Sequence, residues 1–389
     1  MLKNQNIICF SSADWDNPLW TNKQHIMSRL SKENRILYIE SLGLRRPVVS
    51  KRDGFRIIKR IKNCLKGVRK IRANLYVLSP LIIPLHDSKF IRKINMLILY
   101  LILKFCVRNY NLKNPVIWTY IPNIVDLLEK FDKKYVVYHC VDEISQFPGV
   151  TNKIMAMEVE LLKQADIVFV TSITLYENKK KYNKNTFYLP NVADTKHFSK
   201  VLRAGIKMPV DIANIKKPIL GFIGALDDYK IDSDLLRYIA GPQWNIVLIG
   251  PLGLTDRGKT LRDIISMDNI FYLGKKGYNI LPNYLKYFDV CLIPMKINDY
   301  TANVFPMKFF EYLSAGKPVV SVRLPSLKEF QEYAYFADTK YEFKAMINKA
   351  LEEDSEKMQN MRLNLAKENT WEKRIESMER LIETYIKNQ

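Results

Sequence analysis

A lysine and a glutamate three residues apart, Lys308 and Glu311, stand in the stretch "NVFPMKFFEYLSAGKPVVS" at 303–321. Pro306 suits the first turn of a helix, so Lys308 falls where its charge opposes the helix dipole by roughly 0.3–1 kcal/mol. A phosphate would reverse this penalty, because helix N–H groups and a lysine both stabilise an anion. Glu311 shares the helix face and can accept hydrogen bonds from two sugar hydroxyls. The pair predicts a nucleotide diphosphate site; a plain ion pair on a solvated helix is the alternative.

A second group of ionisable side chains follows an expected strand in the first half of the chain. The segment "VVYHCVDEISQFPG" at 136–149 places His139, Asp142 and Glu143 around the carboxyl end of that strand. A carboxylate or histidine there could orient or deprotonate an acceptor hydroxyl. Asp142 is the predicted base or orienting group, with Glu143 and His139 behind it, and a loop-capping role is the alternative. Asp16, in the loop after the first strand, is a weaker candidate on the same side.

Two Asp-x-Asp pairs raise the question of a divalent cation, which paired carboxylates can bind. They are Asp14 with Asp16 and Asp232 with Asp234. Asp232 precedes a helical stretch and suits a helix N-cap instead. We expect no metal, because lysines and helix N–H groups can stabilise a diphosphate by themselves.

Short β-branched or aromatic runs alternate with stretches of helical spacing along the chain. Continuous apolar strands separated by helices are typical of parallel sheets that are covered on both faces. The alternation pauses at 194–217, a polar and basic stretch, and then resumes. The sequence therefore predicts an α/β protein with two doubly wound, Rossmann-like domains that face a central cleft. The predicted strands are 6–10, 35–40, 74–79, 115–120, 135–140, 166–172, 186–190, 218–224, 244–250, 269–274, 289–294 and 317–322.

The domain boundaries follow from this alternation and from chain length. A chain of 389 residues exceeds the roughly 250–300 at which a single core stops growing. We predict an N-terminal domain over 1–200, a C-terminal domain over 201–370, and a C-terminal helix over 371–389 at the domain junction. Neither half contains Gly-x-Gly-x-x-Gly or Gly-x4-Gly-Lys-Ser/Thr, so hydride transfer and ordinary nucleotide hydrolysis lose support.

The net charge of +21 is concentrated in one segment. Residues 45–113 hold 18 basic and two acidic residues around the apolar run "INMLILYLIL" at 94–103. This run is about half the roughly 20 residues that cross a bilayer. We therefore predict that the basic segment faces an anionic membrane without spanning it. A buried helix beside a solvated basic loop is the alternative, and no nucleic-acid partner is expected, because no recognition motif accompanies the charge.

The cysteines and the N-terminus bear on the compartment. The five cysteines are scattered and never form Cys-x-x-Cys, which argues against a disulfide framework or a zinc site. The N-terminus lacks the long apolar region and the cleavage site of a signal peptide. We expect a cytoplasmic protein, associated peripherally with the inner face of the plasma membrane.

Several segments resemble GT-B-fold glycosyltransferases, especially the family-4-type enzymes of bacterial surface-polysaccharide synthesis. The stretch "PMKFFEYLSAGKPVVS" is similar to their nucleotide-binding helix. The segment 11–40, "SSADWDNPLWTNKQHIMSRLSKENRILYIE", looks like the teichuronic-acid and capsule subgroup. Further similar segments are "ADIVFVTS" (165–172), "LPNVADTKHF" (189–198) and "FIGALDDYKIDSDLL" (222–236).

The resemblance implies roles for residues of the second half. Glu311 would hold the nucleotide ribose, while Lys308, Lys230 and the turn at Gly224 would hold the diphosphate. The nucleobase would rest, largely through backbone contacts, on a turn that contains Gly274, Lys275 and Tyr278.

Two departures from the family pattern stand out. Many retaining members carry two glutamates eight positions apart, whereas Asn303 stands eight before Glu311. The usual Gly-Arg-Leu-x-x-x-Lys reads Gly224-Ala225-Leu226 with Lys230, which lacks the arginine. Retention and inversion of stereochemistry both stay open.

The resemblance implies transfer of a sugar from a nucleotide diphosphate donor, most simply a UDP-sugar, without a metal or cofactor. The acceptor would be a lipid-linked or growing bacterial surface glycan such as capsule, teichuronic acid or O-antigen. One alternative is a GT-B sugar-nucleotide epimerase or hydrolase. Another is a non-catalytic, membrane-bound nucleotide-binding scaffold. The sequence sets neither the linkage nor the oligomeric state.

Overall fold

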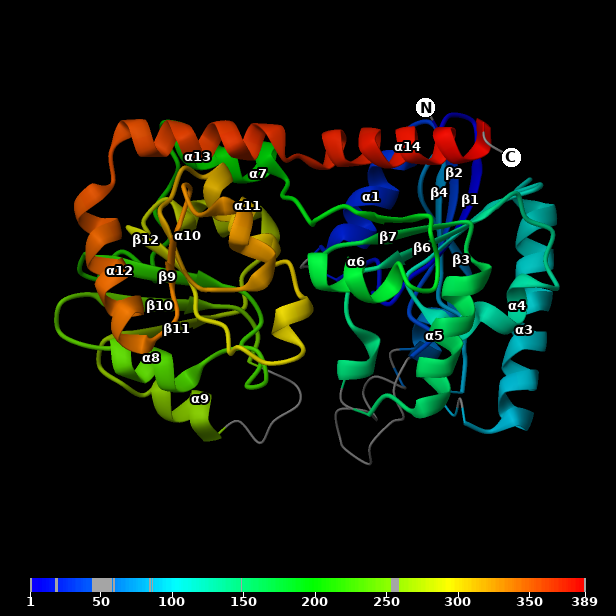
Figure 1. Ribbon diagram of the computed structural model, residues 1–389, viewed down its shortest axis with the longest axis horizontal. Coiled ribbons are helices and arrows are strands. Elements are labelled where there is room, and N and C mark those ends of the chain that lie inside the picture. Colours follow the sequence, from blue (N-terminus) through cyan, green and yellow to red (C-terminus); the bar gives the residue numbers. More distant parts are fainter. Residues whose placement is uncertain are drawn as a thin grey trace. The chain divides into compact units, whose positions relative to one another are not determined.

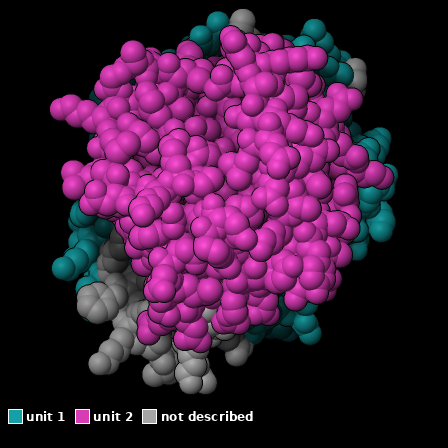
Figure 2. Space-filling model, turned by 90° about the vertical axis from the view of Figure 1, so that its left-hand side faces the viewer, with its two compact units in different colours: residues 1–190, 375–389 teal, residues 191–374 magenta. Residues whose placement is uncertain are grey.

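The computed structural model of the chain describes residues 2–17, 20–43, 58, 60–83, 85, 87–147, 149–252 and 259–387. The chain forms two compact units (Figure 2). Unit 1 consists of residues 1–190 and 375–389, and unit 2 of residues 191–374. Each unit is built on one sheet with helices packed around it (Figure 1).

Unit 1 contains an eight-stranded sheet in the order β3-β4-β2-β1-β5-β6-β7-β8. Neighbours in this order are parallel, except that β3 and β4 are antiparallel. Every residue of β6 is buried, as expected of a strand with helices on both faces. The strands are β1 (Asn6–Phe10), β2 (Arg35–Ile39), β3 (Val68–Arg72), β4 (Leu75–Leu78), β5 (Val116–Thr119), β6 (Val136–Cys140), β7 (Ile167–Val170) and β8 (Thr186–Tyr188).

The helices of unit 1 come from both ends of the chain. They are α1 (Asn22–Leu30), α3 (Lys89–Asn109), α4 (Val125–Leu128), α5 (Asn152–Gln164), α6 (Ile173–Lys179) and the later part of α14 (Trp371–Lys387). The C-terminal helix is bonded to the sheet through Asp166, which accepts the Tyr385 hydroxyl at 2.6 Å and the Val136 N–H at 2.7 Å. The N–H of Leu2 also donates to Glu379, so both chain ends lie together in unit 1 (Figure 1).

Unit 2 contains a six-stranded, fully parallel sheet in the order β11-β10-β9-β12-β13-β14. Its strands are β9 (Ile219–Ile223), β10 (Asn245–Ile249), β11 (Ile270–Gly274), β12 (Val290–Ile293), β13 (Val319–Val322) and β14 (Tyr335–Ala337). Its helices are α7 (Thr195–Phe198), α8 (Ser233–Ile239), α9 (Lys259–Ile264), α10 (Leu281–Leu285), α11 (Met307–Ser314), α12 (Lys340–Glu353) and α13 (Glu356–Glu368).

The two doubly wound units confirm the predicted fold class, and each predicted strand has a counterpart in the structure. Two strands were not predicted. β3 reads VRKIR and is largely exposed at the edge of its sheet, where charged side chains are common. β14, which reads YFA, has only three residues.

Gly221 lies in β9, inside the unit 2 sheet, and provides a test of core packing. A Cβ at this position would lie 1.9 Å from the ring of the buried Phe288. Gly221→Ala should therefore lower the free energy of unfolding of unit 2 by about 1–3 kcal/mol. Calorimetry should show a lower unfolding temperature. Gly277→Ala is the control, because its Cβ would meet only the side-chain oxygen of Asn279, which can rotate away; equal unfolding temperatures for both variants would contradict this account.

Candidate functional site

Lys308 and Glu311 form a direct ion pair on α11. The Lys308 Nζ donates to Glu311 Oε2 at 2.6 Å. Glu311 is 3% exposed, whereas Lys308 is half-buried, and the first turn of α11 contains no acidic residue. The pair compensates the unfavourable position of the lysine at the helix N-terminus. The two predicted nucleotide-binding side chains therefore neutralise each other.

The apolar side of α11 positions this pair against the sheet. Phe309 is fully buried and lies 5.0 Å, ring to ring, from Phe330. Tyr312 is also buried, and its hydroxyl accepts the backbone N–H of Ile223 at 2.9 Å. Ile223 is the last residue of β9, immediately before Gly224. The bond therefore links α11 to the carboxyl end of the strand whose following turn is a predicted diphosphate site.

Gly224 lies where the turns after β9 and β10 make close contact. Its N–H donates to the Ile249 carbonyl at 2.8 Å. Gly250 has a φ of 148°, and a Cβ there would lie 1.8 Å from the Gly224 carbonyl oxygen. Only glycine at position 250 allows this approach. The two turns thus pack directly against each other at the sheet edge where doubly wound domains bind ligands, and both glycines are buried.

Lys230 is held in the loop after β9 by two aromatic rings. Its Nζ lies 5.1 Å from the ring centre of Tyr229 and 5.2 Å from that of Tyr300. Asp227 stands farther from it than a hydrogen-bonded partner, at 3.7 Å. The Lys230 carbonyl accepts the Lys296 N–H at 2.8 Å, which joins the loops after β9 and β12. Lys230 is half-buried, with aromatic rings and one carboxylate around its ammonium group.

Asn303 ends a 3-10 turn, Thr301–Asn303, just before α11. Its Nδ2 donates to the Asp299 carbonyl at 2.7 Å. Its Oδ1 is buried and accepts no hydrogen bond from any residue in the part of the chain that the structure describes. An unsatisfied buried acceptor costs about 1–3 kcal/mol. Asn303, which stands where many members of the similar family have a glutamate, therefore has an unused hydrogen-bond acceptor.

The predicted nucleobase turn follows β11. Gly274 has a φ of 68°, and its carbonyl accepts the Gly250 N–H at 2.9 Å, so this turn touches the Gly250 turn. Lys275 is exposed. The ring of Tyr278 stacks on His197 with 4.2 Å between centres, and His197 Nε2 donates to the Tyr278 carbonyl at 2.8 Å.

His197 was not among the predicted site residues, although it lies in the segment "LPNVADTKHF". Burial lowers the pKa of its imidazole, against the opposing effects of the Tyr278 carbonyl and the carboxylate of Glu311. The negative charge of Glu311 therefore affects the pKa of His197, whose ring stacks on Tyr278. The match to the family segment was a signal for this residue, but its contact with Tyr278, 81 positions away, was not visible in the sequence.

In unit 1, the side chains of His139 and Glu143 are engaged in contacts with other residues of the protein. His139 is buried and stacks on Tyr120 with 4.9 Å between ring centres. Glu143 is buried and accepts hydrogen bonds from Lys179 Nζ and Ser145 Oγ, each at 3.0 Å. Lys179 also donates to Glu158 at 3.1 Å. Burial alone would lower the pKa of Lys179, but Cys140, Glu158 and Glu143 outweigh it and raise the pKa, so the cluster is ionic.

Asp142 is the most accessible of the three acceptor-side candidates around the end of β6. It is half-buried and borders a cavity of about 40 Å³ at the carboxyl edge of the sheet. The remaining lining residues are Ser12, Tyr120, Tyr138, Val141, Ile144 and Phe147. The position suits contact with a hydroxyl.

Asp16 lies on a different part of this edge, in a chain of charges. Asp16 accepts Arg69 Nη1 at 2.6 Å, and Arg69 Nη2 reaches Glu40 at 3.2 Å. Glu40 directly follows β2 and accepts the Trp15 N–H at 2.8 Å. Burial raises the pKa of Glu40, partly offset by its bonds to Ser79 and Trp15. Sequence analysis missed Glu40, although it ends the predicted strand 35–40.

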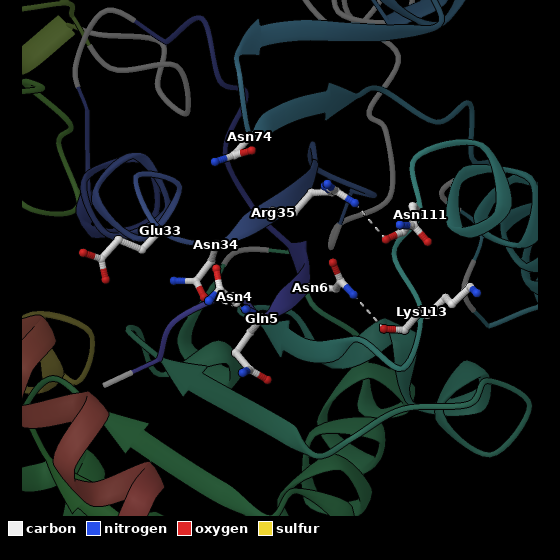
Figure 3. Close-up of a pocket in the computed structure, with 9 residues that line it drawn as sticks. All are labelled: Asn4, Gln5, Asn6, Glu33, Asn34, Arg35, Asn74, Asn111 and Lys113. Carbon is white, nitrogen blue, oxygen red and sulfur yellow. Dashed lines mark hydrogen bonds between the residues drawn. The ribbon is translucent and has the colours of Figure 1, made fainter.

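A polar pocket of about 330 Å³ lies at the opposite edge of the unit 1 sheet (Figure 3). It surrounds the amino ends of β1, β2 and β4, whereas ligands of doubly wound sheets bind beyond the carboxyl ends. Asn34 illustrates how its polar groups serve the fold, because it accepts the Gln5 N–H and donates to the Leu2 and Leu30 carbonyls. The lining residues are Asn4, Gln5, Asn6, Glu33, Asn34, Arg35, Asn74, Asn111 and Lys113.

The acidic pairs form no metal cluster within the described ranges, where no three His, Cys, Asp or Glu side chains come together as ligands. Asp232 is the N-cap of α8 and accepts the Leu235 N–H at 2.9 Å, which confirms its predicted structural role. Asp16 is paired with Arg69.

The two doubly wound units have the fold of the GT-B proteins. Residues 208–368 match the family model described as "Glycosyl transferases group 1". This part of the chain is thus similar to a group 1 glycosyltransferase domain, and the protein is a glycosyltransferase.

Individual proteins agree with this assignment. The chain is 26% identical over 280 residues to the "Putative teichuronic acid biosynthesis glycosyltransferase TuaH" of Bacillus subtilis (strain 168), covering 66% of this chain and 68% of that protein. Anabaena Alr3699/HepE in complex with UDP superimposes with a TM-score of 0.67 at 13% identity, over 98% of this chain and 100% of the other; the same protein is also known with UDP-glucose. Sucrose-phosphate synthase from Thermosynechococcus elongatus gives 0.69 at 16% identity, over 99% and 100%.

The lowered pKa of His197 predicts a pH dependence of unit 2. The unfolded chain binds a proton near pH 6.5, whereas folded His197 does so only at lower pH. The contribution to the free energy of unfolding is therefore complete above about pH 6.5 and is lost as the pH falls through the folded pKa. The protection of the α7 amides, corrected for the slower intrinsic exchange at lower pH, should decrease between neutral and mildly acid pH, and His197→Gln should weaken this response. His25→Gln, in unit 1, is the control; an unchanged pH response in His197→Gln would refute the assignment.

Proposed function

We propose that the protein transfers a sugar from a UDP-sugar to a lipid-linked or growing bacterial surface glycan, at the inner face of the plasma membrane. The observation that carries the proposal is the Lys308–Glu311 pair at the N-terminus of α11 in the group 1 domain. The reaction would use neither a metal nor another cofactor.

The ion pair is suited to exchange its internal contact for a ligand. A diphosphate at the N-terminus of α11 would attract Lys308 and interact favourably with the helix dipole. Glu311 would then be left as a buried carboxylate, with the ribose hydroxyls as its hydrogen-bond donors. Each partner of the pair thus has a replacement within one nucleotide, which keeps the buried charge satisfied.

Lys230 and the Gly224 turn complete the proposed diphosphate site. Lys230 brings a second positive charge, which Tyr229 and Tyr300 hold in place. The Gly224 turn, packed against the Gly250 turn, lies at the carboxyl end of β9, where a phosphate would bind in a doubly wound sheet. In place of the missing arginine, two lysines would stabilise the negative charge that develops on the leaving diphosphate.

Asn303 is assigned to the sugar part of the donor. Its unused Oδ1 would accept a sugar hydroxyl and recover the free energy lost by its burial. Gly274, Lys275 and Tyr278 are assigned to the nucleobase, with His197 behind Tyr278.

The acceptor side is assigned to unit 1. Asp142 would orient or deprotonate the acceptor hydroxyl, because it is the candidate after β6 that borders a cavity. Glu143, paired with Lys179, and His139, stacked on Tyr120, would support that loop. Asp16, through Arg69, would have a secondary role.

The choice of substrates follows the similar proteins. HepE is known with UDP and with UDP-glucose, which favours a uridine donor here. TuaH is named for teichuronic acid biosynthesis, which favours a surface glycan as the product.

UDP binding tests the donor site. Calorimetry of the purified chain against UDP, GDP, ADP and CMP should show preferential binding of UDP. Lys308→Ala and Glu311→Ala should each weaken UDP binding about 10–100-fold, because each removes a charge-assisted hydrogen bond. Lys308→Ala should narrow the preference for UDP over UMP, and Glu311→Ala should have little effect on binding of a dideoxy-UDP that lacks both ribose hydroxyls.

Lys349→Ala provides the matched control, because Lys349 pairs with Glu353 on the exposed surface of α12. Its UDP affinity should equal that of the unmodified chain. Absence of binding by all four nucleotides at millimolar concentration would refute the proposed donor site. Tight UDP binding without any sugar transfer or donor hydrolysis would instead indicate a nucleotide-binding scaffold.

Asp142→Asn tests the acceptor side. The substitution should reduce sugar transfer to membrane extracts by about 100-fold or more while UDP affinity is retained, because it removes the base and leaves the donor unit intact. Asp132→Asn, an exposed carboxylate of the same unit, should transfer at the normal rate. Normal transfer by Asp142→Asn would exclude Asp142 as the base.

A further inference from the structure

Helix α3 has an apolar face that belongs to the core of unit 1. Met96, Leu99, Leu103 and Cys106 are buried in the main hydrophobic cluster of this unit. Asn95 fixes the preceding loop to the same side, because it donates to the Ile83 carbonyl at 2.7 Å and accepts the Ile83 N–H at 3.1 Å. One face of α3 therefore accounts for its attachment to the fold.

The other face of α3 is apolar as well, and it is exposed. Phe90, Leu97, Leu101 and Phe105 are 73%, 59%, 55% and 61% exposed. Their spacing of seven, four and four residues places them along one side of the helix, roughly opposite Leu99 and Leu103. These four side chains are called the outer stripe below. In Figure 1, α3 forms the right-hand margin of unit 1, with no other ribbon beyond it.

Exposed apolar side chains are concentrated around this helix in the sequence. Among the described residues, 12 of the 21 large hydrophobic side chains with high exposure lie between positions 58 and 105. Beyond the outer stripe they are Ile58, Ile61, Leu65, Ile71, Leu81, Ile83, Leu85 and Ile98. Such a concentration is unusual for a surface that contacts only water and indicates an interaction site.

The charges of α3 indicate which kind of partner the outer stripe would bind. The helix contains five basic residues and no acidic one. Lys89 and Lys93 lie near its start and Lys104 and Arg108 near its end, all exposed, so cations occur at both ends of the outer stripe. Arg92 is paired with Asp126 at 2.8 Å. A second copy of the same helix would bring like charges together, whereas anionic lipid headgroups complement the cations and acyl chains complement the stripe.

No helix in the described part of the chain is long and apolar enough to cross a membrane. Its buried face ties α3 to the sheet, so only the outer stripe is available to lipid. We propose that α3 lies in the plane of an anionic bilayer, with Phe90, Leu97, Leu101 and Phe105 inserted among the acyl chains and the flanking lysines at the headgroups. Membrane binding by α3 does not depend on the proposed function. Only its purpose, which is to bring unit 1 to a lipid-linked acceptor, rests on that function.

Vesicle co-sedimentation tests the proposal with the full chain. The protein should bind vesicles that contain phosphatidylglycerol, with weaker binding to phosphatidylcholine alone and at high salt. Leu101→Glu should reduce binding by about tenfold or more, because a carboxylate replaces an inserted apolar group. Val210→Glu is the matched control: Val210 is 89% exposed, lies in unit 2, and undergoes the same change in charge. Equal binding by Leu101→Glu and the unmodified chain would overturn the proposal.

A second variant gives a signal only when the stripe inserts, so that loss of binding through misfolding can be distinguished from loss of the lipid contact. Tryptophan fluorescence of Leu101→Trp should shift to shorter wavelength when anionic vesicles are added and should be quenched by brominated lipid. Val210→Trp should change no more than the unmodified chain with its five tryptophans. No response from Leu101→Trp would overturn insertion of the stripe.

Two further outcomes separate the possible occupants and functions. Self-association without vesicle binding, abolished by Leu101→Glu, would assign the stripe to a second copy and overturn the lipid proposal. UDP binding should be the same in Leu101→Glu and the unmodified chain. A protein that binds vesicles through the stripe but binds no nucleotide would refute the proposed donor site and leave the membrane proposal standing.

Discussion

The attachment of α11 to the end of β9 is the constraint on which the donor side depends. Tyr312 lies inside unit 2, and its hydroxyl accepts the Ile223 N–H, so the helix that holds Lys308 and the turn that begins at Gly224 are fixed relative to each other. Burial raises the pKa of Tyr312 well above its ordinary value, so this hydroxyl keeps its proton. A rigid helix start and a glycine turn are what a diphosphate requires, because its oxygens must meet several donors at once.

The two lysines of this region are held by different physical means. Lys308 is neutralised by a carboxylate at 2.6 Å, whereas Lys230 lies over the rings of Tyr229 and Tyr300. Aromatic rings position a cation without cancelling its charge. Lys230 is therefore positioned by two aromatic rings with Asp227 at 3.7 Å, whereas Lys308 would leave its contact with Glu311 only if Glu311 found other donors.

Local sequence patterns were sufficient for the fold and for part of the site. Apolar runs predicted the central strands, because a strand that is buried on both faces does not alternate between apolar and polar residues. Lys308 and Glu311 could be placed on one face of a helix from their spacing alone. Contacts between distant positions were not predictable. Glu143 meets Lys179 across 36 positions, and this tertiary contact, absent from any local pattern, separates its environment from that of the adjacent Asp142. The edge strand β3 was not predicted, because its charged residues break the apolar pattern expected of a strand.

The composition of unit 1 from residues 1–190 and 375–389 has a consequence for biosynthesis. The ribosome completes unit 2 before it delivers the segment that contains Met378 and Ile382, both buried in the finished protein. Until then Asp166 lacks its bond from Tyr385. Unit 1, whose larger part precedes unit 2 in the chain, therefore obtains its last segment only after all of unit 2 has been synthesised.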